Sequence, residues 1–411
     1  MPRSPSSPAF WRSPLRGPWF TSVLGVVLLA GITVLFVTGL LSYAAYNPDL
    51  SPVNDQTPDK GLLGFYLFSW PTHPSWLYRL TQGVHVTLGI ALIPVLLAKL
   101  WSVVPKLFAL PPARSLAHAL ERLSLLLLVG GGLFEFTTGV LNVQLDYIFP
   151  GSFYPLHFYG AWVFFAAFLA HAVLKTPLAL RNLRHIRDEQ PSGEGELVSP
   201  NPADPTVSRR GALGVVGGGS LLLLATTAGR SFDGPLRETA VLAPHGGPEP
   251  GGGPGGFQIN KTAAYAGISP TETGEEAWRL VVTGRDGRSV RLDRPQLLQL
   301  ALHSSALPIA CVEGWSTSDQ WWRGVRLRDL AALVGHDDPV DVLVESLQRH
   351  GAFRRAALRA NQVADPRSLL ALFVNGEDLT PDHGYPARVI VPAAPGVLNT
   401  KWVARMTFGD L

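Results

Sequence analysis

The chain has few charged residues and a single cysteine, and each shortage excludes a class of protein. Of its 411 residues only 16% are charged and 46% are hydrophobic, a balance too apolar for an ordinary water-soluble protein. The only cysteine, Cys311, excludes an internal disulfide, a zinc site built on paired cysteines and an iron–sulfur cluster held by four cysteines of this chain. The net charge of +3 comes without a long run of Lys or Arg, so nucleic acid is not expected as a partner.

Long apolar runs fill the first half of the chain. A hydrocarbon core of ~30 Å takes about 20 apolar residues to cross. Four segments meet that length, at residues 19–43, 81–104, 123–143 and 157–174. A fifth segment, residues 211–229, is rich in glycine but uncharged. The sequence therefore predicts an all-α bundle of four transmembrane helices, followed by a fifth span that serves as an anchor.

The basic residues around these segments predict the orientation, because loops rich in Lys and Arg stay on the cytoplasmic side. Such residues gather before the first segment, between the second and third, and after the fourth, whereas the other loops are neutral to acidic. Five crossings from an inside N-terminus place everything after residue 229 outside. We expect a multi-pass protein of a bacterial cytoplasmic membrane with its C-terminal domain on the extracytoplasmic side.

Two arginines precede the fifth segment. The stretch Ser208-Arg209-Arg210-Gly211 resembles a twin-arginine export signal, and that route carries domains already folded around a cofactor. The alternative is a pair of arginines that only orients an ordinary span. No small-residue cleavage site is obvious after Thr227, so we expect the segment to remain as an anchor.

Histidines inside the apolar segments are candidate haem ligands, because ionisable residues there are costly and usually functional. His157 and His171 are fourteen residues apart, close to four helical turns, so both rings leave one helix face ~21 Å apart. His85 matches the depth of His157, and His118 that of His171. The second span does not repeat the pair, since Lys99 follows His85 by fourteen residues. One haem is therefore expected and a second is possible, the alternative being histidines that only pack helices.

This pattern, over roughly residues 19–180, resembles the bacterial membrane b-type cytochromes that serve dehydrogenases and reductases. The resemblance rests on His85, His157 and His171 together with the spans. It implies haem b held between helices and electron exchange with the membrane quinone pool.

The surroundings of Cys311 carry a second set of motifs. A lone cysteine is often only a small buried hydrophobe, but one thiolate can ligate a metal whose other sulfurs come from a pterin dithiolene. The motifs are Cys-Val-Glu-Gly-Trp-Ser at 311–316, Trp-Arg-Gly-Val at 322–325, Val-Asn-Gly-Glu-Asp-Leu at 374–379, His-Gly-Tyr-Pro-Ala-Arg at 383–388 and Lys-Trp-Val at 401–403. Their order resembles the sulfite oxidase family of molybdopterin domains, including the bacterial periplasmic methionine sulfoxide reductase branch, over residues 257–411.

The resemblance implies an α+β domain in which Cys311 ligates molybdenum and Lys401 helps to hold the pterin phosphate. By the same resemblance Asn260, Lys261, His383 and Arg388 are candidate cofactor contacts, although each could also be an ordinary surface or turn residue. The sequence departs from the family at Leu398, where a lysine is common, and at residues 350–353, where a tyrosine is missing. The departures leave the substrate undetermined.

The expected organisation has four parts: a four-span cytochrome-b-like domain at 1–205, the twin-arginine-like segment and fifth span at 206–230, a Gly/Pro-rich linker at 231–256 and the molybdopterin domain at 257–411. The expected function is electron transfer between membrane quinone, b-type haem and a molybdenum centre that moves an oxygen atom on a small sulfite- or sulfoxide-type substrate. The alternatives are a non-catalytic electron carrier with a degenerate molybdopterin-like domain, and a transporter-like protein without a redox role. Neither the direction of electron flow nor the oligomeric state follows from the sequence.

Overall fold

The computed structural model describes residues 13, 15–54, 68–104, 108, 115–143, 153–184, 207–232, 235–242, 254–351 and 353–411. Much of the expected linker and the expected boundary at residue 205 lie outside these residues. The chain divides into two compact units, treated separately below. The first takes in the described residues up to Val37 and from His85 to Thr226, and the second those from Thr38 to Val84 and from Thr227 to Leu411.

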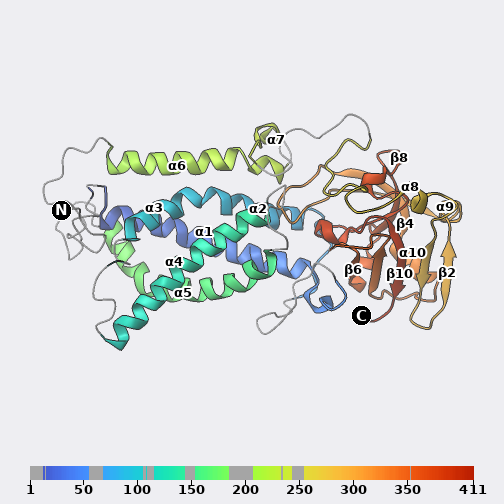
Figure 1. Cartoon of the computed structure of the whole chain (residues 1–411), viewed down its shortest axis with the longest axis horizontal. Helices are drawn as coiled ribbons and strands as arrows, with labels where there is room; N and C mark the ends of the chain where they lie inside the picture. Colours follow the sequence, from blue (N-terminus) through green and yellow to red (C-terminus); the bar gives the residue numbers. More distant parts are fainter. Residues whose placement is uncertain are drawn as a thin grey trace. The chain divides into compact units, whose positions relative to one another are not determined.

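Helices make up the first unit (Figure 1). They are α1 (Pro18–Ala45) and α2 (Leu77–Ala91), which both run into the second unit, α3 (Ile93–Val103), α4 (Leu116–Asn142), α5 (Tyr154–Arg184) and α6 (Arg209–Ala225). Each of the five segments expected to be membrane-spanning is helical. By length and composition four helices among the described residues could cross a membrane, or five if α2 and α3 form one bent span.

The bend between α2 and α3 has a local cause. The two helices meet at an angle of 43° around Leu92. Pro94 lies in the first turn of α3, where it has no amide hydrogen to give and its ring excludes the carbonyl four residues earlier. The sequence predicted a span over roughly residues 81–104; the structure divides this stretch into two helices, the first of which begins at Leu77.

A side-chain stripe along α1 forms the core of the first unit. Phe20, Leu24, Leu28 and Ile32 recur every fourth residue, so they lie on one face of α1. They pack with Leu92, Val95 and Leu96 around the bend and with Phe164 and Phe168 of α5. Helices α4 and α5 pack closely, since Gly131 lies against the Phe164 side chain, as small residues allow in membrane helices.

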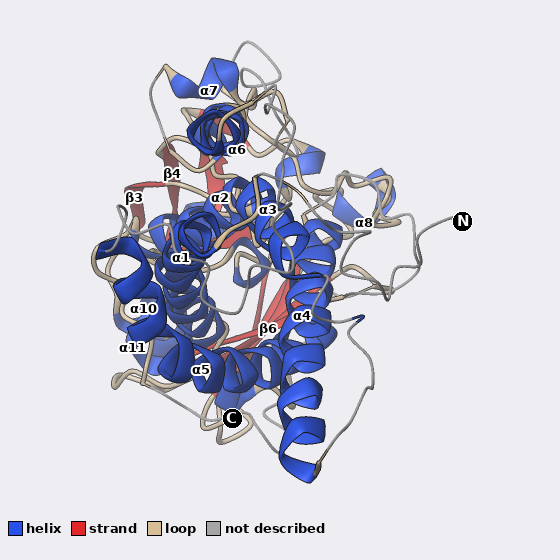
Figure 2. Ribbon diagram, turned by 90° about the vertical axis from the view of Figure 1, so that its left-hand side faces the viewer, coloured by secondary structure: helices blue, strands red, loops and turns tan. Residues whose placement is uncertain are grey.

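Two five-stranded sheets form the second unit (Figure 2). The first has the order β2 (Ser289–Leu292), β1 (Leu280–Thr283), β10 (Val403–Phe408), β5 (Val342–Ser346) and β6 (Arg355–Leu358), with only β1 and β10 parallel. The second has β3 (Leu302–Leu307), β4 (Gln320–Arg326), β7 (Leu369–Val374) and β8 (Glu377–Asp378), with β9 (Arg388–Ile390) also paired to β7. The α+β expectation for this part of the chain is confirmed.

Short helices connect the strands. They are α7 (Leu236–Thr239), α8 (Pro270–Thr273), α9 (Arg294–Leu298), α10 (Leu327–Ala332) and α11 (Ala360–Ala364), with single 3-10 turns at Pro48–Leu50, Ala228–Arg230, Pro381–His383 and Gly396–Leu398. Side chains that cap their own helix start α8 and α9, where Ser269 and Asp293 accept hydrogen bonds from backbone amides of the first turn.

Strand β7 explains how the second unit is layered. Its residues alternate between two cores, with Leu370 and Leu372 in one cluster and Leu369 and Ala371 in the other. The larger cluster fills the space between the two sheets, and the smaller one lies on the opposite face of the second sheet. A strand buried on both faces reads as a continuous apolar run, which is why residues 369–374 contain no polar side chain.

Segments from the first part of the chain belong to the second unit. The Asn47 side-chain amide donates to the carbonyl oxygen of Ala357 at 3.1 Å. The Trp70 indole donates to the carbonyl oxygen of Ala393 at 2.7 Å, and the Asn361 amide donates to that of Trp70 at 2.9 Å. The unit is therefore built from residues on both sides of α3 to α6, and the linear boundaries expected from the sequence stay predictions.

Replacing Gly324 by Ala should destabilise the second unit. Strands β4 and β7 approach so closely there that a methyl group would overlap the carbonyl oxygen of Leu370, which is backbone and cannot rotate away. Overpacking of this kind costs about 3 kcal/mol, which corresponds to a fall of roughly 6–12 °C in the midpoint of thermal unfolding. Arg323→Ala, at the exposed neighbouring position, is the control and should shift the midpoint little. Equal midpoints for both variants would contradict the close approach.

Candidate functional site

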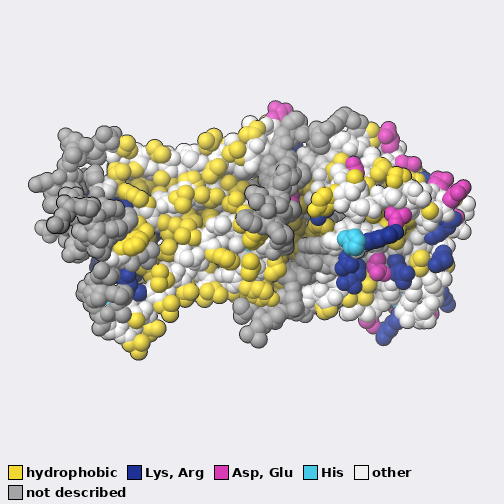
Figure 3. Space-filling model, in the orientation of Figure 1, with side chains coloured by type: hydrophobic (Ala, Val, Ile, Leu, Met, Phe, Trp, Pro, Cys, Tyr) yellow, Lys and Arg dark blue, Asp and Glu magenta, His cyan; other side chains and the backbone are white. Residues whose placement is uncertain are grey.

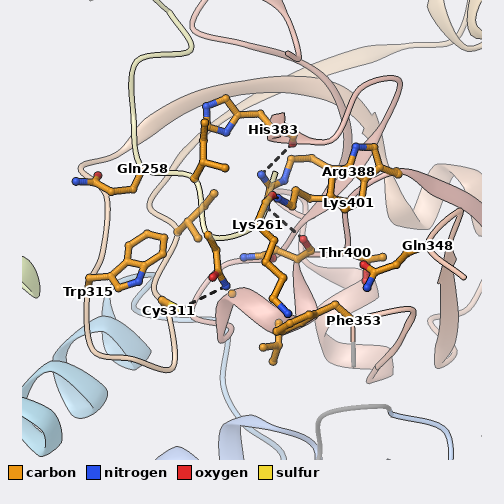
Figure 4. A pocket seen from close by; sticks show the side chains of 17 residues that line it. Gln258, Lys261, Cys311, Trp315, Gln348, Phe353, His383, Arg388, Thr400 and Lys401 are labelled. Atoms are coloured by element: carbon orange, nitrogen blue, oxygen red, sulfur yellow. Dashed lines mark hydrogen bonds between the residues drawn. The ribbon is translucent and has the colours of Figure 1, made fainter. Parts of the chain in front are cut away.

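The second unit contains a pocket with an empty volume of about 660 Å³, part of it open to solvent. Cys311 lines it and is 3% exposed. All six residues that the sequence nominated in this part of the chain also line it: Asn260, Lys261, Cys311, His383, Arg388 and Lys401 (Figure 4). They come from segments far apart in the sequence, so the fold brings the predicted site residues together.

A tight turn holds Cys311 at the pocket wall. The Cys311 amide donates to the carbonyl oxygen of Trp315 at 2.8 Å, and the Gly314 amide donates to that of Cys311 at 3.1 Å. Gly314 has a φ of 88°, in the left-handed region that favours glycine. The Trp315 indole donates to the Glu313 carboxylate at 2.9 Å, which closes the turn on itself. The glycine and tryptophan of the sequence motif therefore have structural roles that fix the cysteine.

The environment of the sulfur disfavours a free thiolate. Burial raises the pKa of the Cys311 thiol well above its ordinary value, and the nearby Glu313 charge raises it further. The one side-chain donor recorded near the sulfur is the Asn260 amide, at 3.8 Å from Sγ. A cation at the sulfur would reverse this balance, since a coordinating thiol loses its proton to the metal charge. The environment therefore does not favour a reactive free cysteine.

Positive side chains form the opposite part of the wall. Arg388 is 4% exposed and its Nη1 donates to the carbonyl oxygen of His383 at 3.0 Å. The Lys401 ammonium donates to the carbonyl oxygens of Asp382, at 2.9 Å, and of Lys261. In the described part of the second unit neither Arg388 nor Lys401 has a carboxylate within ion-pair distance. Burying a charge without an opposite charge nearby costs free energy. A bound anion beside Arg388 and Lys401 would lower that cost.

The pKa values of these groups are lowered, because burial disfavours their charged forms. Burial lowers the pKa of Lys401 to about 7, and the neighbouring Arg388 charge adds to the effect. Burial likewise lowers the pKa of Arg388 to about 9. For His383 burial lowers the pKa to about 4, so its ring is neutral near pH 7. Perturbed groups gathered in one pocket are typical of a functional site.

Polar atoms without partners complete the pocket. Four buried atoms among its lining residues have no hydrogen-bond partner in the described part of the chain: Gln258 Oε1, Arg388 Nε, Asn399 Nδ2 and Thr400 Oγ1. Three of the four can donate. Buried donors are rarely left unsatisfied unless something outside the chain binds them. The donors, the two cations and the lone sulfur fit an anionic, phosphate-bearing pterin that coordinates a metal.

His383 and Lys261 line the pocket and are both held by aromatic neighbours. The His383 ring stacks on Phe257 at a centroid distance of 3.8 Å and contacts the Gly255 carbonyl oxygen at 2.9 Å. The ring is thus held by the protein and forms wall. Lys261 lies over the Phe353 ring at 4.4 Å and over that of Tyr265 at 4.9 Å, which keeps its charge beside the pocket.

Sequence reasoning missed several lining residues. Gln258, Asn399 and Thr400 gave no signal of their own, although the last two directly precede the Lys-Trp motif. Trp315 is buried and also lines the pocket.

In the first unit the structure brings His85 and His157 together. Their ring centroids are 6.2 Å apart, with the ring planes at 88°. His85 Nδ1 lies 3.0 Å from the carbonyl oxygen of Leu35. His157 Nδ1 lies 2.9 Å from Thr138 Oγ1 and 3.1 Å from the Glu135 carboxylate. Each ring therefore has its Nδ1 engaged within the unit, and Glu135 is a buried partner that the sequence reading overlooked.

The other two histidines lie on neighbouring helices. His118 is in the first turn of α4, where its amide donates to the capping Ser115 hydroxyl at 3.2 Å. His171 is in the second half of α5, and both side chains are partly exposed. Their joint role as ligands of an inner haem stays a prediction.

Comparison with known proteins bears on the second unit. Residues 266–410 match the family model described as the oxidoreductase molybdopterin binding domain. The chain is 31% identical over 156 residues to mitochondrial sulfite oxidase of Mus musculus, which covers 32% of this chain and 29% of that protein. It is 30% identical over 131 residues to the uncharacterized oxidoreductase YuiH of Bacillus subtilis (strain 168), covering 32% of this chain and 65% of the relative.

A third relative is the protein-methionine-sulfoxide reductase catalytic subunit MsrP of Gluconobacter oxydans (strain 621H), 31% identical over 151 residues, with 32% of this chain and 47% of that protein covered. The chain thus spans between 29% and 65% of the length of these three relatives. The C-terminal domain is a sulfite-oxidase-like molybdopterin-binding domain, of the type found in molybdenum-dependent oxidoreductases.

Anion binding at this wall should depend on the charge of Lys401. Because its pKa is about 7, the ammonium is charged below that pH and neutral above it. In cofactor-free protein, sulfate affinity should fall by about tenfold between pH 6 and pH 8, which corresponds to about 1.4 kcal/mol. Calorimetric titration measures it, and sulfate keeps its own charge over this range. Lys401→Met should bind weakly at both pH values, whereas Arg291→Met, an exposed control, should keep the pH dependence.

Proposed function

We propose that the chain is a membrane-bound molybdopterin-dependent oxidoreductase, which exchanges electrons between membrane quinone, b-type haem and a molybdenum centre at Cys311. At that centre an oxygen atom is moved to or from a small substrate of the sulfite or sulfoxide type. The observation that carries the proposal is the pocket itself, where one buried sulfur faces unpaired donors and uncompensated positive charge.

Molybdopterin bound in this pocket would supply two-electron oxygen-atom transfer. Cys311 is the metal ligand, because it is the only thiol of the chain and its side chain reaches the pocket. Arg388 and Lys401 balance the charge of the pterin phosphate, and the unpaired atoms of Asn399 and Thr400 donate to it. Trp315 closes the wall beside the sulfur, which keeps water from the ligand.

His85 and His157 would hold the haem iron, since the separation of their rings leaves room for one metal ion between them. Two metal–imidazole bonds of about 2 Å, with about 1.2 Å from each nitrogen to its ring centre, put the centroids about 6.4 Å apart; the observed separation is 6.2 Å. Each Nδ1 is engaged by Leu35, or by Thr138 and Glu135. In this arrangement Nε2 would be the ligand atom, since the outer-shell partners of ligating histidines engage the other ring nitrogen.

A haem at this site would carry single electrons. We place a second haem at His118 and His171, on the spacing of His157 and His171 along α5. The quinone pool is the proposed partner on the membrane side, because a protein with its iron inside the lipid can reach a lipid-soluble carrier.

The surface of the helices supports a membrane location. Figure 3 shows hydrophobic side chains spread over the helices of the first unit, whereas charged side chains gather on the second. Leu174, Val215 and Leu221 are 74%, 74% and 65% exposed, an apolar exposure that water disfavours and lipid does not. We propose a bacterial cytoplasmic membrane with the molybdopterin domain on the extracytoplasmic side and the Arg209-Arg210 segment as a twin-arginine signal that stays as an anchor.

The substrate class follows from the relatives alone. Two of the similar proteins are a sulfite oxidase and a methionine-sulfoxide reductase subunit, and both names refer to oxygen on sulfur. We propose a small sulfur-centred oxygen donor or acceptor for this chain as well.

Replacing Cys311 by Ser should abolish the oxygen-atom transfer while leaving the haem spectrum intact. The hydroxyl is a poor substitute for a metal thiolate, so turnover of sulfite or methionine sulfoxide with artificial electron acceptors or donors should fall by more than about a hundredfold. Purified protein with unchanged b-type absorbance and undiminished turnover would overturn the ligand role. Ser305→Ala, buried on β3 away from the pocket lining, is the control and should keep its turnover.

Replacing His157 by Ala should remove the outer haem. The reduced-minus-oxidised absorbance of detergent-purified protein should lose the bands of that haem, and quinol-linked activity should disappear, whereas activity with artificial dyes persists. His73→Ala, at an exposed loop histidine, is the matched control and should keep both. A spectrum unaltered by His157→Ala would show that the ring only packs between helices.

A further inference from the structure

A short, partly buried segment that follows α6 in the chain contacts the cysteine turn, residues 311–316. The described residues among 228–237, which we call the strap, belong to the second unit together with that turn. Arg230 and Ser231 are each 2% exposed. None of the described strap residues lines the pocket, and all of them precede residues 266–410, the stretch that matches the family model. The strap is therefore an element that neither the pocket lining nor the family match accounts for.

Hydrogen bonds from both ends of the strap reach the cysteine turn. The Ser316 amide donates to the carbonyl oxygen of Arg230 at 2.8 Å, and the Ser316 hydroxyl donates to that of Ser231 at 3.0 Å. The Ser231 hydroxyl in turn donates to the carbonyl oxygen of Gly314. The Arg237 guanidinium donates to the carbonyl oxygen of Ser316 at 2.8 Å. The turn is thus held at its tip, at Gly314, and at its last residue.

The packing around Ser231 fixes where its hydroxyl lies. Gly83 of α2 approaches so closely that a Cβ atom at this position would lie 2.5 Å from Ser231 Cβ and 3.3 Å from the Phe232 ring. All three residues belong to the second unit. Only glycine leaves space for the strap at this point, so Ser231 has little room to move and its hydroxyl stays directed at the turn.

The bonds at the base of the cysteine turn close it but do not orient it. The Thr317 amide donates to the carbonyl oxygen of Ile309, and the Ile309 amide donates to the Thr317 hydroxyl, both at 2.9 Å. A loop paired only at its base can hinge there unless its tip is bonded elsewhere. The strap supplies such bonds, and the Gln82 amide adds one to the carbonyl oxygen of Val312. Outer-shell bonds of this kind orient a metal ligand and tune the metal.

We propose that the strap positions the metal ligand: Ser231 and Arg237 hold the cysteine turn in the orientation in which Cys311 Sγ binds the molybdenum. The inference rests on the proposed function. Both are positioning residues, because neither lines the pocket and each acts through the backbone of the turn. The ligand site is then incomplete within residues 257–411 and needs a segment that lies earlier in the chain.

The test compares full-length, detergent-purified variants that each remove one bond of the strap. Ser231→Ala removes the donor to Gly314, and Arg237→Met removes the donor to Ser316 while keeping a long side chain. Molybdenum content is measured first, so that every rate is given per molybdenum. With sulfite or methionine sulfoxide and artificial electron carriers, each variant should lower kcat by about threefold and the double variant by about tenfold, or about 1.4 kcal/mol of barrier, with KM unchanged.

Electron paramagnetic resonance supplies a readout that a loss of stability alone does not change. Partial reduction with dithionite gives Mo(V), whose g values depend on how the sulfur is oriented toward the metal. The g values of Ser231→Ala and Arg237→Met should differ from those of the unaltered protein. Variants whose g values and kcat per molybdenum are unchanged overturn the positioning role, and this includes variants that only contain less molybdenum.

Glu238→Gln and Thr273→Val are the matched controls. Glu238 is exposed and directly follows Arg237, so its replacement alters the same short helix without removing a bond to the turn. The buried Thr273 hydroxyl donates to backbone carbonyl oxygens of its own helix, α8, away from the pocket lining. Both controls should keep the g values and kcat. A shift in Thr273→Val as large as that in Ser231→Ala would show that the effect is not specific to the strap, and would also overturn the role.

The positioning role and the proposed function fail in different ways. Unaltered protein that binds no molybdenum refutes both. Unaltered protein that binds molybdenum but turns over no sulfur substrate refutes the proposed chemistry, while the Mo(V) spectra of the variants still decide the positioning role. Active unaltered protein whose strap variants keep its spectrum and its kcat refutes the positioning role alone.

Discussion

The second unit depends on the burial of positive charge without a compensating carboxylate. Arg388 and Lys401 donate hydrogen bonds to backbone carbonyl oxygens, which carry no charge to balance theirs. Burial lowers the pKa values of both groups, and the size of this shift reflects the free-energy cost of burying their charges. A chain retains such a wall when a ligand supplies the missing negative charge, and a phosphate-bearing pterin does so. The stability of the domain and the presence of its cofactor are in this way coupled.

The same logic applies to the lone sulfur. A thiol whose pKa is raised by burial and by Glu313 is inert on its own, and it becomes a ligand only when a metal displaces its proton. The pocket thus combines two incomplete halves, a cationic wall that lacks an anion and a sulfur that lacks a cation. A metal bound to an anionic organic ligand would supply both the missing anion and the missing cation. The family resemblance and the geometry agree for this physical reason.

Much of the C-terminal site could be predicted from the sequence, because its residues lie in motifs with a fixed order. Cys311, Arg388 and Lys401 were identified in this way and line one pocket. Gln258, Asn399 and Thr400 were not, since a polar side chain shows its missing partner only once the fold has buried it. His383 also lines the pocket, and the stacking of its ring on Phe257 is a contact that the motif did not predict.

In the helical unit the residue counts predicted His85 and His157 at equal depth, and their rings lie 6.2 Å apart; their role as haem ligands stays a prediction. The bend at Pro94 and the Glu135 contact to His157 were missed. The bend depends on a single proline ring within an apolar run, and the length of that run alone predicted one span. The contact between Glu135 and His157 depends on which faces of α4 and α5 meet, and helix periodicity alone does not predict this.

The contribution of Asn47 and Trp70 to the second unit bears on how the protein is assembled. Their bonds to Ala357 and Ala393 join segments made early in translation to residues made much later. On the proposed export route the cofactor-loaded domain folds in the cytoplasm, while these early segments have already emerged on the other face. The domain would then cross the membrane without these hydrogen bonds and form them only after export. The complete fold of the second unit would therefore depend on translocation.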